Sequence, residues 1–169
     1  MRIITVKSTD NDLIDQSAKL ISRMYGRESP YAEWIVNGFR PYNAEYILTQ
    51  VNNPERSLHV IIDKESVIAT IILQRAKKHM IFHKFCVSLD YKGKGIGKRL
   101  MSFAEKQARK QGFAKMRIEV FSAAFKLFNY YIKNRYDKVI TVNPLQEDQY
   151  IKYACRGASY GFIMLEKSL

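Results

Sequence analysis

Three glycines within five residues, Gly93, Gly95 and Gly97, constrain this chain more than any other feature of its sequence. They lie between residues 79–87, a run that predicts a strand, and an amphipathic run that predicts a helix from Ile96. Glycine permits positive φ and leaves room for a ligand beside the main chain. At the N-terminus of a helix, several main-chain N–H groups can then converge on one anion. The segment therefore predicts a binding site for a pyrophosphate group.

Two well-known phosphate-binding patterns do not fit this segment. The dinucleotide pattern G-x-G-x-x-G fails, because Gly93 and Gly95 would require a glycine where the chain has Lys98. The P-loop pattern fails as well, because Gly97 and Lys98 are followed by Arg99 rather than by Ser or Thr. The glycines alone also leave open a tight turn that holds no ligand.

The chain as a whole predicts one domain, residues 1–169, of the α/β or α+β class. Apolar periodicity predicts the order strand, helices, three strands, helix, strand, helix and two strands. The predicted strands are residues 2–7, 57–63, 66–75, 79–87, 115–121, 136–142 and 162–167. The predicted helices are residues 10–25, two short pieces within 29–53, residues 96–111 and residues 123–134.

The composition excludes several other classes of protein. No apolar run reaches the roughly 20 residues that a membrane-spanning helix needs. The first residues lack the apolar core of an export signal. Cys86 and Cys155 are too few for a disulfide framework, and no further Cys or His pair completes a zinc-site spacing. We therefore expect a cytoplasmic protein with neither a metal site nor a membrane partner.

Positive charge is the second signal in the composition. The chain has 28 Lys and Arg against 16 Asp and Glu, a net charge of +12. Such a charge attracts nucleic acid, anionic lipid or a small polyphosphate ligand, and it is also typical of a surface that is merely soluble. The charge supports an anionic ligand without selecting one.

The glycine loop, within residues 87–100, resembles the acetyl-CoA loop of the GNAT superfamily of N-acetyltransferases. The family pattern is Arg or Gln, two residues, Gly, one residue, and Gly or Ala. Lys92, Gly95 and Gly97 stand at its fixed positions, with Lys92 as a conservative replacement. The order of strands and helices is also similar over residues 57–142.

A second similarity lies downstream of the loop. Many family members have Tyr, three residues and then Gly-Phe after the helix that follows the fifth strand. This chain has Tyr131, Arg135 and Tyr136 at that spacing, so Arg replaces Gly and Tyr replaces Phe. The Asn often found seven residues before the Tyr is Ala124 here, which would remove a side-chain contact to pantetheine.

The resemblance implies a single-domain GNAT-like fold, in which a mixed sheet of about seven strands is flanked by about four to five helices. The fourth and fifth strands would splay apart, and acetyl-CoA, the cosubstrate, would lie between them. Its pantetheine arm would meet main-chain groups of Phe85, Cys86 and Val87, one of whose N–H groups would polarise the thioester carbonyl. The residues implied to hold its pyrophosphate are Lys92, Gly93, Lys94, Gly95, Ile96, Gly97 and Lys98.

The implied reaction is a direct transfer, in which a neutral amine attacks the acetyl carbon and the thiolate leaves. Tyr131 is the predicted acid for the leaving sulfur, since a phenol with a pKa of about 10 is a suitable proton donor. His83 and Glu119 are the predicted bases for the amine. For all three, packing or a surface role is the alternative. We expect His83 to share a strand face with Phe85 and Val87.

The expected acceptor is a primary amine of a small molecule or a peptide. In this fold the acceptor site is shaped by the first helices and by the loop between the last two strands, here residues 143–161. The first helices offer aromatic side chains that could bind a flat or cationic amine or could be core residues. These are Tyr31, Trp34, Phe39, Tyr42 and Tyr46.

Two alternatives to an active enzyme remain open. The basic helix and the net charge would suit a nucleic-acid-binding module, but no helix–turn–helix, RRM or zinc signature supports it, so nucleic acid is the less favoured partner. A family member that binds acetyl-CoA without catalysis, as a regulator, would carry the same motifs. The oligomeric state is also open, with a homodimer as one option.

Overall fold

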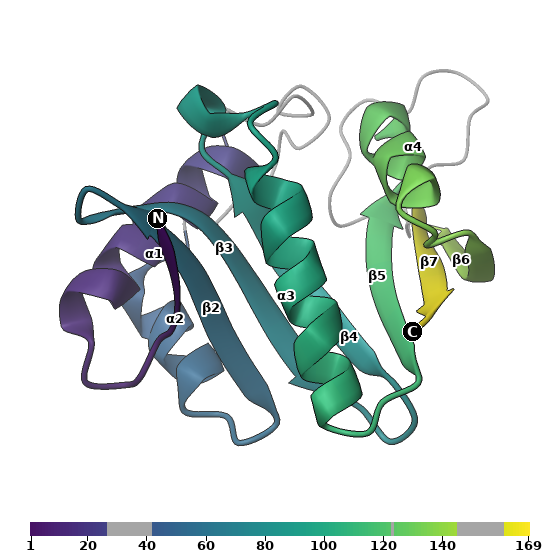
Figure 1. Ribbon diagram of the computed structural model, residues 1–169, viewed down its shortest axis with the longest axis horizontal. Helices are drawn as coiled ribbons and strands as arrows, with labels where there is room; N and C mark the ends of the chain where they lie inside the picture. The colour runs from purple at the N-terminus through teal and green to yellow at the C-terminus, as the bar shows by residue number, and fades with distance from the viewer. Residues whose placement is uncertain (27–41, 123, 145–160) are drawn as a thin grey trace.

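The centre of the computed structural model is a mixed sheet (Figure 1). The structure describes residues 1–26, 42–122, 124–144 and 161–169. Within them, seven strands follow the order β1-β2-β3-β4-β5-β7-β6, and β4 pairs with β5 in parallel. The strands are β1 (Arg2–Thr5), β2 (Arg56–Asp63), β3 (Ser66–Arg75), β4 (Met80–Val87), β5 (Lys115–Phe121), β6 (Lys138–Pro144) and β7 (Gly161–Ser168). The predicted fold class and the predicted order of elements are confirmed.

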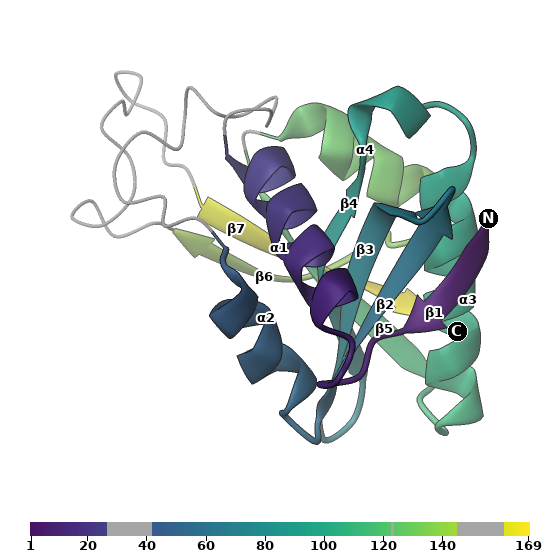
Figure 2. The same cartoon turned by 90° about the vertical axis from the view of Figure 1, so that its left-hand side faces the viewer.

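Helices cover both faces of the sheet. They are α1 (Asn11–Tyr25), α2 (Ala44–Val51), α3 (Ile96–Lys110) and α4 (Phe125–Lys133), with a 3₁₀ turn η2 (Leu89–Tyr91) before α3. α1 and α2 lie on one face, and α3 and α4 lie on the other (Figure 2). α2 is the second of the two short pieces predicted within residues 29–53, and the first piece falls outside the described residues. None of the described helices is long and apolar enough to cross a bilayer.

Each face of the sheet has its own apolar core, because the helices are amphipathic. On α3, the buried residues Ile96, Leu100, Ala104 and Ala108 recur every four positions and form one stripe against β3, β4 and β5. A second cluster, around the fully buried Ile21, joins α1 and α2 to the opposite face. The helices therefore fix the sheet from both sides.

β4 and β5 pair only where they begin. Met80 pairs with Met116 and Ile81 with Arg117, and no further pair joins the two strands among the described residues. Beyond these pairs the strands diverge into a V that opens toward the N-terminus of α3 (Figure 1). The predicted splay between the fourth and fifth strands is confirmed. Unpaired strand edges can accept an extended ligand, so the V is a candidate binding site.

A β-bulge interrupts β4 at Lys84. The main chain there has a φ of +51°. The pairing shifts from Ile72 with His83 to Thr70 with Cys86, so a step of two residues on β3 matches three on β4. The bulge therefore reverses the alternation of side chains along β4.

This reversal puts Phe85 and Val87 on the opposite face of the sheet from His83. Phe82 before the bulge, and Phe85 and Val87 after it, all contact the core under α3 and α4. His83 pairs with Ile72, which belongs to the core under α1 and α2, and cross-strand partners share a face. The prediction that His83 shares a face with Phe85 and Val87 is therefore wrong.

Candidate active site

The glycine loop presents a row of main-chain N–H groups at the N-terminus of α3. Gly93 and Gly95 have φ values of +76° and +75°, in the left-handed region that glycine enters without strain. Within the described ranges, no carbonyl accepts from the N–H groups of Gly95, Ile96, Gly97 or Lys98. The positive end of the helix dipole adds to their field. This geometry fits the predicted pyrophosphate site.

Gly97 lies at a close approach of α3 to β4 and α4. A Cβ atom at this position would stand 3.3 Å from Cζ of Phe85 and 3.3 Å from the hydroxyl oxygen of Tyr130. A Cβ atom at Gly95 would meet nothing within 4 Å, so Gly95 is required by its backbone conformation instead. The missing Cβ atom of Gly97 therefore allows this close packing of α3 on the splayed part of β4 and on α4.

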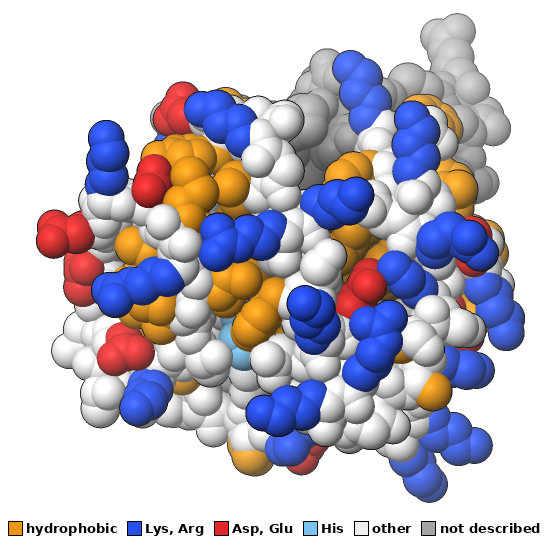
Figure 3. Space-filling view, viewed as in Figure 1, with side chains coloured by type: hydrophobic (Ala, Val, Ile, Leu, Met, Phe, Trp, Pro, Cys, Tyr) orange, Lys and Arg blue, Asp and Glu red, His pale blue; other side chains and the backbone are white. Residues whose placement is uncertain are grey.

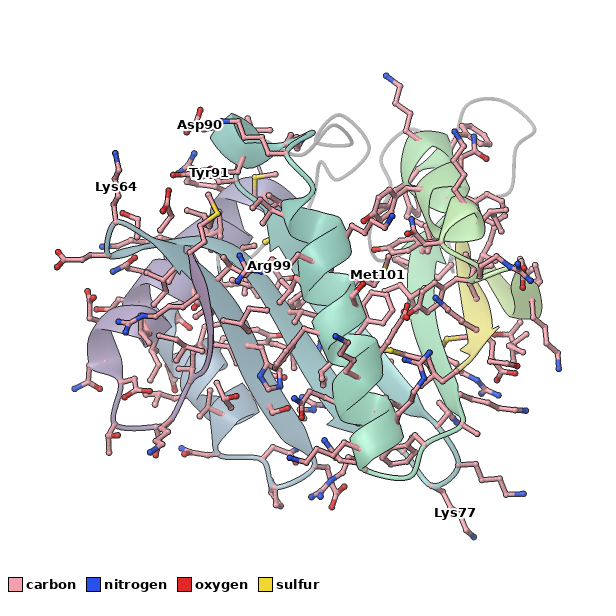
Figure 4. All side chains as sticks on the ribbon, in the orientation of Figure 1. Lys64, Lys77, Asp90, Tyr91, Arg99 and Met101 are labelled. Atoms are coloured by element: carbon pink, nitrogen blue, oxygen red, sulfur yellow. The ribbon has the colours of Figure 1, made fainter. Side chains whose placement is uncertain are left out.

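Two hydrogen bonds fix the loop to distant parts of the chain. The hydroxyl of Tyr91 donates to Oδ2 of Asp63, in the β2–β3 turn, at 2.8 Å, and this bond raises the pKa of Tyr91. Nη2 of Arg99 donates to the carbonyl of Met1 at 3.1 Å. Figure 4 shows Tyr91 and Arg99 beside the first half of α3. The two bonds tie the loop and the first turn of α3 to the end of β2 and to the N-terminus of the chain.

Exposed lysines surround the loop. Lys92, Lys94 and Lys98 are all exposed, and Nζ of Lys94 lies 5.2 Å from the centroid of the Tyr91 ring. Figure 3 shows that Lys and Arg side chains spread over this whole face of the molecule rather than gathering in one patch. The net charge therefore does not mark the site, whereas the geometry of the glycine loop does.

The splayed part of β4 turns main-chain groups toward the V. Residues of an antiparallel ladder point their N–H and C=O groups alternately toward one neighbour and away from it. Ser88 donates its N–H to β3 at 2.8 Å, so Cys86 also faces β3, while Val87 and Phe85 face the V. The carbonyl of Phe85 accepts there from the hydroxyl of Tyr25, on α1, at 3.4 Å.

The thiol of Cys86 is a buried packing group. Its Sγ lies 3.1 Å from Oγ1 of Thr70, on the face of α1 and α2. Burial raises the pKa of Cys86 to about 11. Because the thiolate is the reactive form, this thiol is inert at neutral pH.

Tyr131 reaches from α4 to the splayed part of β4. Its side chain is 2% exposed. The ring centroid lies 5.9 Å from that of Phe82, 6.4 Å from that of Phe85 and 6.1 Å from that of Tyr136. The structure therefore places Tyr131 beside Phe85, in a position that fits both the predicted acid and the packing alternative.

His83 and Glu119 lie on the opposite face, on either side of the V. Ile81 pairs with Arg117 in the parallel pair. Two residues further along each strand, His83 and Glu119 point to the same side, which is the face of α1 and α2. The two predicted bases thus share one face, although the reason expected for His83 was wrong.

These two side chains have different surroundings. Glu119 is exposed, whereas Nε2 of His83 is buried and has no hydrogen-bond partner in the part of the chain that the structure describes. Burial, together with the positive charges of Lys84 and Arg56, lowers the pKa of His83 to about 4. His83 is therefore a neutral imidazole at pH 7 and a weak base.

Lys84 and Tyr25 also lie here, and no sequence motif marks either of them as a site residue. Nζ of Lys84 donates to the hydroxyl of Tyr42 at 2.6 Å. It lies 5.1 Å from the ring centroid of Tyr25, 4.2 Å from that of Tyr42 and 5.9 Å from that of Tyr46. Three aromatic rings from α1, α2 and the segment before α2 thus surround one ammonium group.

Only part of the predicted acceptor site can be described. Tyr42 and Tyr46 contact each other with ring centroids 4.8 Å apart. The other predicted residues, Tyr31, Trp34, Phe39 and residues 145–160, lie outside the described residues. Across the described ranges, no group of three or more His, Cys, Asp or Glu side chains could hold a metal ion.

Comparison with known families gives one match that covers most of the chain. The family model described as the acetyltransferase (GNAT) family matches residues 21–133. The match includes the glycine loop, the splayed strands and Tyr131. None of the curated proteins compared with the chain matches it in sequence.

Solved structures share the whole fold at low sequence identity. An aminoglycoside 6'-N-acetyltransferase complexed with coenzyme A is 18% identical, with a TM-score of 0.72 over 99% of this chain and 97% of its own. An IAA acetyltransferase from Bacillus cereus is 18% identical, with a TM-score of 0.68 over 99% of both chains. The ribosomal-protein-S18-alanine N-acetyltransferase from Escherichia coli is 14% identical, with a TM-score of 0.68 over 99% of this chain and 92% of its own.

Proposed function

Because the chain belongs to the acetyltransferase (GNAT) family, we propose that it transfers an acetyl group from acetyl-CoA to a primary amine of a small molecule or a peptide. One observation carries the proposal. The N–H groups of Gly95, Ile96, Gly97 and Lys98 have no carbonyl partner in the described residues, and they stand at the head of α3 beside the splayed strands. The first N–H groups of any α-helix lack an intrahelical partner, and here the left-handed Gly93 and Gly95 and the adjoining splayed strands leave them available to an anion.

The residues of the loop and the V fit acetyl-CoA. The loop supplies N–H donors and lysine charges for a pyrophosphate. Gly97 lets the start of α3 pack closely against Phe85 and Tyr130, which brings the loop next to the splayed part of β4. Main-chain groups of Phe85 and Val87 face the V and would hold the pantetheine arm, while Cys86 supports that strand through its pairing with β3. The solved neighbour complexed with coenzyme A supports the same ligand.

Acetyl-CoA supplies the acetyl group in activated form, as a thioester. Holding the two reactants side by side at the V would remove much of the entropic barrier. Tyr131, on the face of α3 and α4, would donate a proton to the leaving sulfur. An N–H of the splayed strand near Val87 would donate to the acyl oxygen.

The base for the amine would act from the opposite face. His83 and Glu119 both point there, so an amine approaching from α1 and α2 would meet them on either side of the V. The low pKa of His83, about 4, makes it a weak base at neutral pH, and its ring is partly buried, whereas the carboxylate of Glu119 is exposed to water. We therefore favour Glu119, acting directly or through water, and assign His83 a positioning role.

A pair of glycine variants tests the loop. Gly95 and Gly112 have φ values of +75° and +82°, and a Cβ atom at either meets nothing within 4 Å. Gly95→Ala and Gly112→Ala therefore impose the same backbone strain, about 1 kcal/mol. Only Gly95 belongs to the loop, so Gly95→Ala should weaken acetyl-CoA binding, measured by titration calorimetry, at least about 10-fold relative to Gly112→Ala.

Thiol release over a panel of amines tests the transfer itself. The names of the neighbours give acceptors as different as aminoglycosides and a ribosomal-protein alanine. The panel must therefore include aminoglycosides, polyamines, amino acids and peptides. Acceptor-dependent release of free thiol supports the proposal. Tight acetyl-CoA binding with no release across the panel would favour the silent regulator, and equal binding by both glycine variants would remove the loop assignment.

A further inference from the structure

A partly buried ammonium group stands on the α1–α2 side of the V, and the reaction proposed above gives it no task. The polar partners of Lys84 are the neutral hydroxyls of Tyr42 and Tyr46. Its Nζ lies over the rings of Tyr25 and Tyr42, 5.1 Å and 4.2 Å from their centroids. Within the described ranges, no carboxylate lies within ion-pair distance of this charge.

Keeping this group here costs the fold free energy in two ways. Burial lowers the pKa of Lys84, because it opposes the charged form. The φ of +51° is strained for a residue that carries a Cβ atom. A partly buried cation that meets rings and hydroxyls instead of a carboxylate retains its capacity to bind an anion.

Lys84 stands where an acceptor must approach. The next residue, Phe85, has its carbonyl at the V, where it accepts from Tyr25. The proposed cosubstrate enters from the face of α3 and α4, so the acceptor comes from the face of α1 and α2. That face carries Lys84 on β4 and Glu119 on β5, a cation and a carboxylate on either side of the V.

We propose that Lys84 binds a carboxylate of the acceptor, so that the acceptor is an amino acid or a similar amine with a carboxylate close to its amino group. This rests on the proposed acetyl transfer. A zwitterion matches the arrangement, with its carboxylate toward Lys84 and its amino group toward Glu119. An amine without a carboxylate would bring a second positive charge next to Lys84 and Arg56, which repel it.

Acceptors that differ only in the carboxylate test the proposal. Each free amino acid is compared with its amide and with its decarboxylated amine, for example phenylalanine, phenylalaninamide and 2-phenylethylamine. The first readout is kcat/KM from thiol release. The second is binding of each compound to the protein saturated with coenzyme A, measured by calorimetry, which needs no turnover.

Three variants isolate the charge. Lys84→Met removes the charge and keeps the length of the side chain. Lys84→Arg keeps the charge. Lys77→Met removes an exposed lysine at the far end of the sheet from the loop, which Figure 4 labels, and serves as the matched control. A thermal shift with acetyl-CoA shows that each variant is folded.

For the wild-type protein, kcat/KM and the binding affinity should be at least about 10-fold higher for the free amino acid than for its amide or its amine. A hydrogen bond to a charged group usually contributes about this much. Lys84→Met should lose that preference, while Lys84→Arg and Lys77→Met retain it. An unchanged preference in Lys84→Met, or a wild-type preference for the amine, would overturn the proposal. If no compound releases thiol, the transferase proposal alone fails. Loss of amino-acid binding in Lys84→Met would then still support the carboxylate site. Absence of amino-acid binding in the wild-type protein would overturn the carboxylate site.

Discussion

Arg135, after the end of α4, has the same left-handed backbone conformation as Gly112 after the end of α3, with φ values of +69° and +82°. In each case the N–H of the next residue, Tyr136 or Phe113, donates to the carbonyl five residues before it, at 3.0 Å. This is the Schellman helix end, in which glycine is favoured because it carries no Cβ atom. α4 thus uses a conformation that suits glycine at a position where the chain has arginine.

Replacing Arg135 by glycine should therefore stabilise the protein. Glycine removes the strain of the left-handed conformation from the folded state but makes the unfolded chain more flexible. The first effect is larger, so the free energy of unfolding should rise by roughly 0.5–1 kcal/mol. The ion pair that is lost, between Arg135 and Asp137 at 3.3 Å, joins side chains that are 80% and 53% exposed, so it contributes little. Chemical denaturation measures the free energy of unfolding. Arg135→Ala, which loses the ion pair and keeps the strain, should show no gain, and an equal gain in both variants would contradict the explanation.

Most of the fold could be predicted from the sequence, because the signals that mark its strands and helices are local. The strands predicted at residues 66–75 and 115–121 coincide with β3 and β5. Apolar spacing and turn residues are local signals, and here tertiary contacts did not override them. The loop was the strongest local signal, because its glycines stand between a predicted strand and a predicted helix and match the spacing of a family pattern.

The bulge at Lys84 was missed although its signal was present. Met80 and Phe82 are two residues apart, whereas Phe85 follows Phe82 by three, so the apolar spacing changes phase at the bulge. Assuming unbroken alternation placed His83 on the wrong face. The aromatic rings around Lys84 had no such signal in the sequence. Lys84 and Tyr42 are 42 residues apart, and only the packing of α1 and α2 on the sheet brings them together.

The bond between Tyr91 and Asp63 should affect ligand binding more than folding. Tyr91→Phe removes the tie between the loop and the β2–β3 turn, so the loop must be ordered when the ligand binds, and acetyl-CoA should bind about 3- to 10-fold more weakly. Calorimetry measures the affinity. Asp63→Asn should give a similar loss, and the double variant should lose little more, because both changes break one bond. Fully additive losses would show that the two residues act independently.

Tyr131→Phe tests the proposed acid. Loss of a general acid should lower kcat about 100-fold and change the affinity for acetyl-CoA much less. Tyr136→Phe is the matched control, since Tyr136 is also a buried tyrosine of this cluster and its hydroxyl donates to Glu105 at 3.2 Å. That variant should lower stability and leave kcat near the wild-type value. Similar kcat values for Tyr131→Phe and the wild type would assign Tyr131 to packing alone.

His59 makes the stability of the fold depend on acid. His59 is 5% exposed, and its ring lies between the hydroxyls of Thr5 and Ser57, each 2.9 Å from a ring nitrogen. The ring centroid of Phe103 is 5.0 Å from that of His59, in a T-shaped contact. Burial lowers the pKa of His59 to about 4. The folded protein therefore keeps this imidazole neutral at pH values where the unfolded chain, with a pKa of about 6.5, binds a proton.

The contribution of His59 to the free energy of unfolding should consequently be constant above about pH 6.5 and fall as the pH drops toward 4, because the unfolded state binds the extra proton in that window. In this window the unfolded state binds nearly one proton more than the folded state at His59. The free energy of unfolding therefore changes by about 1 kcal/mol per pH unit through His59 alone. His59→Gln keeps a donor and an acceptor for the two hydroxyls but does not titrate, so it should flatten the curve by that amount. His79→Gln, at a less buried site, should flatten it less. Denaturation at a series of pH values and fixed ionic strength measures all three curves, and an unchanged slope in His59→Gln would show that other groups cause the acid sensitivity.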